Sequence, residues 1–180
     1  MPENRKKVFS QAQSAWKVIR DVDGFYGQWG GWNVRRPTEA GILSLWRDSS
    51  SYEAFMPHVH DSIFHKTKQE KTYERLSVTL LEGVSSLPGG KGAIRRTLSS
   101  RWISLSDHQL HLERVDSFIS EQQSYWHTAE NLDGDEVALF LGRALNRPNR
   151  CLLFTLLRNE PALESVRNRQ LFRQQEEWLV

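Results

Sequence analysis

The stretch Gln13-Ser14-Ala15-Trp16 returns as Gln123-Ser124-Tyr125-Trp126, a shift of 110 positions along the chain. An Asp-Gly pair follows seven residues after each tryptophan, at Asp23-Gly24 and again at Asp133-Gly134. Two further pairs keep the correspondence at a shift of 111: Arg36-Pro37 with Arg147-Pro148, and Arg47-Asp48 with Arg158-Asn159. Solenoid repeats have periods of about 20–50 residues, so this spacing is too long for one. The repeat predicts a duplicated small domain.

Length and composition agree with two small globular units. The chain has 180 residues, of which 38% are hydrophobic and 26% charged, and its net charge is +2. Domains of about 90 residues can form their own core. The single cysteine, Cys151, lies in the apolar run Cys151–Phe154, which predicts a buried, inert thiol.

Several classes of partner are not expected. Basic residues do not alternate with aromatic ones as in nucleic-acid-binding segments, and no apolar run approaches the length of a membrane span. The amino terminus, with Arg5-Lys6-Lys7, precedes no apolar signal-peptide region. The sequence therefore predicts a cytoplasmic protein with no nucleic-acid or membrane partner.

The first half predicts a helix, a hairpin, a second helix and a strand. Apolar residues at helical spacing define the first helix and its buried stripe: Val8, Ala12, Trp16 and Ile19. Gly24 should end this segment in the left-handed conformation. Residues 25–32 and 40–46 are the expected strands of the hairpin, with a glycine bulge in the first. Alternation predicts a further strand over 73–81.

The second helix of this half has its own start signal and stripe. Ser50 and Glu53 have the spacing of a capping box. Pro57 should kink the helix or start a new segment. The apolar stripe consists of Tyr52, Phe55, Met56, Val59 and Ile63.

The second half follows the same plan after a linker at 84–97, which is rich in glycine and serine. The predicted domains are 1–83 and 98–180. Strands are expected over 102–112, 137–141 and 151–157, with a turn at 146–149. One helix should contain Val115 to Trp126, and Pro161 should lie in the first turn of the other. Trp178 to Val180 offers the only fragment of a closing strand.

Each half reads as a strand-helix-strand-strand-helix-strand unit with one strand missing or hidden. The fold class is therefore α+β, with two ferredoxin-like units forming an intrachain dimeric α+β barrel. The first half lacks an opening strand, which leaves open whether one precedes Met1. The chain is expected to be a monomer with an internal pseudo-dimer, or a homodimer.

A family resemblance adds to this interpretation. The pattern Phe9-Ser10-x-Ala12-Gln13-x-x-Trp16, Gly24-Phe25-x-Gly27-Gln28-x-Gly30-Gly31-Trp32 and His60-Asp61-x-Ile63 resembles the YdbC-like domains over residues 8–82. These domains are similar to the dimeric α+β barrel superfamily, which includes antibiotic-biosynthesis and haem-degrading monooxygenases. The resemblance implies a ligand between the sheet and the helices, with tryptophan and histidine side chains contributed by the helices.

The candidate site residues all lie in the first half. His60 and Asp61 are the candidates for catalytic proton transfer, because a neutral histidine acts as a base near neutral pH. The candidate ligand-binding residues are Gln28, Trp29, Trp32, Phe55 and His65. The alternative is structural: His60-Asp61 orders the helix end, and both tryptophans fill the core. Trp16 and Trp126 are expected in the core.

No metal site is predicted, because no two of His58, His60 and His65 have the three- or four-residue spacing that makes side chains neighbours on a helix. No cofactor is predicted either, although the resemblance leaves haem open, because His65 follows Phe55 by ten positions, close to where a haem-binding histidine would fall in the relatives. The second half lacks the Gly-rich tryptophan strand and the His-Asp pair, so the first half should carry any site. Three functions are compatible with these features: a small-molecule-binding, cofactor-independent oxygenase, a non-catalytic ligand sensor, and a structural module. Whether the protein is an enzyme stays undecided at this level.

Overall fold

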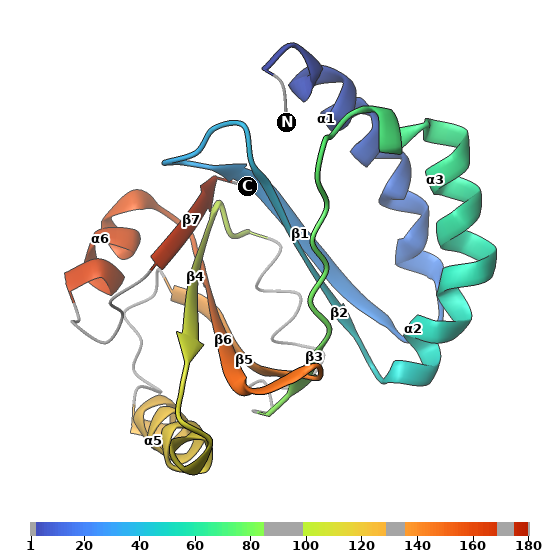
Figure 1. Ribbon diagram of the computed structural model, residues 1–180. Coiled ribbons are helices and arrows are strands. Elements are labelled where there is room, and N and C mark those ends of the chain that lie inside the picture. Colours follow the sequence, from blue (N-terminus) through green and yellow to red (C-terminus); the bar gives the residue numbers. More distant parts are fainter. Residues whose placement is uncertain (1–2, 85–98, 129–135, 169–174, 180) are drawn as a thin grey trace. The chain divides into compact units, whose positions relative to one another are not determined.

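The computed structural model describes residues 3–84, 99–128, 136–168 and 175–179 (Figure 1). The chain divides into two compact units. Unit 1 consists of residues 1–32 and 36–77, and unit 2 of residues 33–35 and 78–180. The predicted linker at 84–97 lies, apart from Val84, outside the described residues. Val84 itself packs against the core of unit 2.

Unit 1 begins with a helical segment that changes its winding. The short η1 (Glu3–Arg5) leads into α1 (Lys6–Ser14), and a 3-10 segment, η2 (Ala15–Asp21), follows. Phe9, Ala12 and Ile19 are buried, whereas Val8 is 51% exposed, so its predicted place in the stripe was wrong. The tighter winding of η2 changes the side-chain period after Ser14. Gly24 has a φ of 78°, which confirms its left-handed conformation.

The hairpin of unit 1 forms as predicted. Strand β1 (Phe25–Asn33) pairs antiparallel with β2 (Ala40–Trp46), and the register shifts between Phe25 and Gly27. Gly27 is required here, because a Cβ at this position would lie 2.6 Å from the ring of Trp29. The helices of unit 1 cover one face of this hairpin (Figure 1).

The second helical segment of unit 1 has three parts: α2 (Ser49–Phe55), the π-helical turn η3 (Met56–His60) and α3 (Asp61–Thr67). The π-helical turn begins at Met56, next to Pro57, which lacks a backbone N–H. The prediction that a new segment starts near Pro57 is thereby confirmed. The prediction that Ser50 caps this helix was wrong, because the N-cap of α2 is Asp48. The apolar stripe is confirmed: Phe55 and Ile63 are buried with Ile19, and the remaining stripe residues pack around them.

The strand predicted over 73–81 was wrong. A short 3-10 turn, η4 (Gln69–Lys71), precedes this segment. Only β3 (Leu81–Gly83) at its end is a strand, and it pairs with β5 (Glu136–Ala144). Leu76 and Val78 are 66% and 65% exposed. The alternation in this segment therefore does not bury an apolar face.

Unit 2 is an antiparallel sheet with helices on one face. Its elements are β4 (Trp102–Gln109), η5 (Leu112–Arg114), α5 (Val115–Thr128), β5 (Glu136–Ala144), β6 (Arg147–Leu157), α6 (Glu160–Asn168) and β7 (Gln175–Leu179). The strand order in this unit is β7-β4-β6-β5-β3. The closing strand exists as β7 and pairs with β4. The predicted turn at 146–149 is shorter, because β6 already begins at Arg147.

The core of unit 2 lies between this sheet and its helices. Val115 of α5 packs with Leu139, Leu141, Cys151 and Leu153 of the sheet, while Leu163 of α6 packs with Leu157. Cys151 is fully buried, as predicted. Burial raises the pKa of the Cys151 thiol, so the unreactive protonated form is favoured.

Candidate functional site

His60 is the polar residue around which aromatic side chains of unit 1 gather. The ring centroid of His60 lies 5.2 Å from that of Trp16, 5.8 Å from that of Phe55 and 5.6 Å from that of Phe64. The Phe64 ring is stacked on the imidazole, at an interplanar angle of 14°. The His60 side chain keeps 27% of its surface exposed. An imidazole is thus held between aromatic walls and still reached by solvent.

The imidazole of His60 is oriented by its neighbour in the chain. Its Nδ1 lies 2.9 Å from Oδ1 of Asp61. When Nδ1 carries the proton, it donates to this carboxylate and leaves Nε2 as an acceptor. The described residues provide no hydrogen-bond partner for Nε2. This arrangement suits a base that removes a proton from a bound molecule.

Trp16, another of these aromatic walls, is fixed by a different segment of unit 1. Its Nε1 donates a hydrogen bond of 2.8 Å to Oε1 of Gln69, which is buried in η4. The η4 segment is itself held, since Thr72 Oγ1 donates to the Gln69 carbonyl at 2.7 Å and Arg5 donates to the Lys71 carbonyl at 2.9 Å. Trp16 is half-buried. Its ring packs against the core of unit 1 and also contacts the ring of His60.

Gln28 and Trp32 lie on the helix-covered face of β1. Trp32 meets Phe9 of α1 edge to face at 5.6 Å, and the Lys6 ammonium lies 4.7 Å from the centre of the Trp32 ring. Gln28, four residues earlier, shares this face because strand side chains alternate. Its Oε1 accepts a hydrogen bond of 2.9 Å from the Ser44 hydroxyl.

Trp29 and His65 are not brought to His60. Trp29 alternates with Trp32, so it lies on the other face of β1, where it is buried. His65 is exposed on α3 and contacts Phe64 at its edge, at 5.8 Å. The π-helical turn between Phe55 and His65 changes the angular relation that a regular helix would give these two residues.

The structure therefore brings His60, Asp61 and Phe55 together and adds two residues that sequence reasoning did not assign to the site. Phe64 follows His60 by four positions, the spacing at which side chains on a helix contact each other. The sequence alone could therefore have placed Phe64 beside His60. Trp16 comes from a different segment, and no local signal links it to His60. Within the described residues, no three His, Cys, Asp or Glu side chains are grouped closely enough to hold a metal ion. The described helices include none of the length and apolarity needed to cross a membrane.

Comparison with solved structures defines the class of fold. A "putative monooxygenase" from Lactobacillus acidophilus superposes on 98% of this chain and 87% of its own, with a TM-score of 0.73 and 11% identity. A "putative monooxygenase" from Fusobacterium nucleatum covers 99% of this chain and 87% of its own, with a TM-score of 0.76 and 11% identity. The chain has a monooxygenase-like α+β fold.

The amino-terminal half has a closer likeness in sequence. Residues 1–81 match the family described as a domain of unknown function, DUF4937. Over 78 residues the chain is 35% identical to the uncharacterized protein YdbC of Bacillus subtilis (strain 168), and this stretch is 42% of the chain and 66% of YdbC. The YdbC-like resemblance of the first half is thereby confirmed. The chain spans slightly less than two thirds of that relative.

Proposed function

We propose that this protein binds a small molecule as a monooxygenase-like α+β barrel, formed within one chain by two ferredoxin-like units. The order of β7, β4, β6 and β5 supports the ferredoxin-like plan for unit 2. The likeness to the two solved structures supports the joint plan, because it extends over 98% and 99% of the chain. A single chain then supplies both halves of the barrel, as a monomer or within a homodimer.

The observation that carries the proposal is the His60-Asp61 pair between the rings of Trp16, Phe55 and Phe64. The His60 imidazole fills the space between these rings, so a flat, electron-rich molecule would stack on their outer faces. His60 is the base that takes a proton from it. Loss of that proton makes the substrate itself able to reduce dioxygen, which is the chemistry of an oxygenase without a resident cofactor. Gln28 and Trp32 are the proposed further contacts to the ligand.

A ligand sensor is the second candidate, and one observation favours it. Phe64 is stacked on His60, and the outer face of such a stacked pair is a flat wall. Such a wall can hold a planar ligand without proton transfer. The two functions share the site and differ in whether His60 changes the bound molecule. Residence in the cytoplasm stays a prediction.

The test uses a hydroxylated anthrone as the probe, because its ring methylene loses a proton to a base. One methylene and one dioxygen would give one carbonyl and one water. Dioxygen uptake is measured with the full chain, with His60→Asn, and with the control His58→Asn, a neighbouring exposed histidine. Uptake that is lost only in His60→Asn supports the oxygenase. Binding without uptake supports the sensor, and absence of binding contradicts both.

A further inference from the structure

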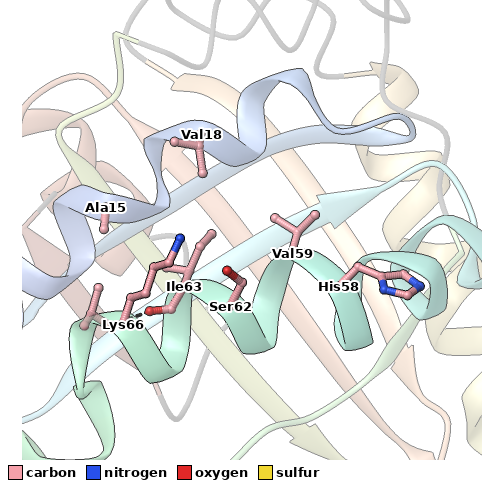
Figure 2. A pocket seen from close by; sticks show the side chains of 8 residues that line it. Ala15, Val18, His58, Val59, Ser62, Ile63 and Lys66 are labelled. Atoms are coloured by element: carbon pink, nitrogen blue, oxygen red, sulfur yellow. Dashed lines mark hydrogen bonds between the residues drawn. The ribbon is translucent and has the colours of Figure 1, made fainter.

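A surface groove of about 390 Å³ lies between two helical segments of unit 1. Ala15 and Val18 line it from η2, and residues between His58 and Thr67 line it from η3 and α3 (Figure 2). His60 and Asp61 do not belong to its lining. The groove is therefore a separate feature of the molecule, and binding in it is independent of the oxygenase or sensor function proposed for the His60 site.

The floor of the groove is apolar. Val18 is 58% exposed, although it is a large aliphatic residue within a hollow. Val59 and Ile63 face it from the opposite helix (Figure 2). Ile63 is only 9% exposed, so an apolar group in the groove would remove mainly the surface of Val18 and Val59 from water. This is favourable in proportion to the area covered.

The rim of the groove is cationic at one end. The Lys66 side chain points from α3 toward η2 (Figure 2). Among the described residues, no carboxylate forms an ion pair with Lys66. His58 lines the other end of the groove. Eight positions separate the two residues, which is about 12 Å along a helix.

We propose that this groove binds a small anionic amphiphile. A carboxylate or similar anionic head pairs with Lys66, and an unbranched apolar chain lies over Val18, Val59 and Ile63. The groove has a volume of about 390 Å³ and is open to solvent on one side, so it would cover only part of such a ligand. The ammonium of Lys66 selects an anion rather than a cation or an uncharged molecule, since an ion pair requires opposite charges.

The probe is decanoate, kept below its micelle-forming concentration, with decylammonium and decanol as its matched partners. Methyl signals of Val18, Val59 and Ile63 report binding in the full chain by NMR titration. Decanoate should bind more tightly than either partner. Each methylene removed from the chain should weaken binding about twofold, half of the free-energy effect of full burial, because one side of the groove is open.

The variant Lys66→Glu should weaken decanoate binding about tenfold, because attraction is replaced by repulsion. It should also reverse the preference, so that decylammonium binds more tightly than decanoate. Lys17→Glu is the control, since this exposed lysine of η2 does not line the groove. Val18→Ser, at an exposed position that tolerates change, should weaken both probes. Equal binding of decanoate and decylammonium, or unchanged affinity in Lys66→Glu, would overturn the proposal.

Discussion

The Asp48 carboxylate accepts a hydrogen bond of 2.7 Å from the backbone amide of Ser51, and α2 begins at this contact. Arg47 contributes further hydrogen bonds to this region. Its Nε donates to Asp48 at 2.9 Å, and its two terminal amino groups donate to the Asp23 carboxylate at 2.9 Å each. The loop that ends η2 is thereby tied to the start of α2.

The first prediction concerns acid stability. The hydroxyl and backbone amide of Ser51, followed by Arg47, lower the pKa of Asp48 from 3.8 to about 2. Because the pKa is lower in the folded chain, the unfolded chain takes up the proton first, and stability is lost as the pH falls from about 4 to about 2. The midpoint of thermal unfolding should fall more steeply over this window in the wild type than in Asp48→Asn. Parallel curves for the two proteins would contradict this role.

The second prediction tests the corresponding cap in unit 2. Oδ1 of Asn159 accepts a hydrogen bond of 2.9 Å from the backbone amide of Ala162, so it caps α6 as Asp48 caps α2. Asn159→Ala should reduce the free energy of unfolding by about 1 kcal/mol. Asn159→Asp keeps the acceptor and should restore most of that loss. Denaturant unfolding measures both, and equal stability of the two variants would argue against the cap.

The repeated sequence pattern locates the helix caps better than the local capping signal does. The repeat matches Arg47-Asp48 with Arg158-Asn159, yet the capping-box spacing favours Ser50 as the cap of α2. Both Asp48 with Ser51 and Ser50 with Glu53 have the spacing of a cap and its partner. The backbone amide of Arg47 bonds to the Gly24 carbonyl at 2.7 Å, which fixes where β2 ends and gives the cap to Asp48. That contact is tertiary, so local pattern could not decide between them.

The site was predictable where it is local. His60 and Asp61 are adjacent, and Phe55 lies on the same helical segment, so the sequence alone placed them together. Trp16 reaches His60 only through the packing of η2 against η3, and its hydrogen bond to Gln69 joins residues 53 positions apart. The strand prediction over 73–81 was wrong because the alternation of apolar and polar residues indicates that a segment can form a strand. It does not indicate whether a partner strand is there to pair with it.

The third prediction compares two glycines with different surroundings, Gly27 in β1 and Gly83 in β3. A Cβ at Gly27 would meet the rigid ring of Trp29, which is buried, whereas a Cβ at Gly83 would meet nothing within 4 Å. Gly27→Ala should therefore lower the free energy of unfolding by about 1–3 kcal/mol, the usual cost of overpacking. Gly83→Ala, the matched control, should change it by less than about 0.5 kcal/mol. A similar effect of both substitutions would mean that the Trp29 contact is not the cause.

The fourth prediction tests how Trp16 is held against His60. Gln69→Leu removes the acceptor of the Trp16 Nε1–H bond, which should cost about 1 kcal/mol in the free energy of unfolding. The indole ring should also move, because nothing else among the described residues accepts this hydrogen bond. Since the Trp16 ring lies 5.2 Å from that of His60, the ring-proton shifts of His60 in the NMR spectrum should change. Gln69→Glu keeps an acceptor oxygen and should leave those shifts nearly unchanged. If Gln69→Leu alters stability but not the His60 signals, Gln69 supports the fold and does not position the wall of the candidate site.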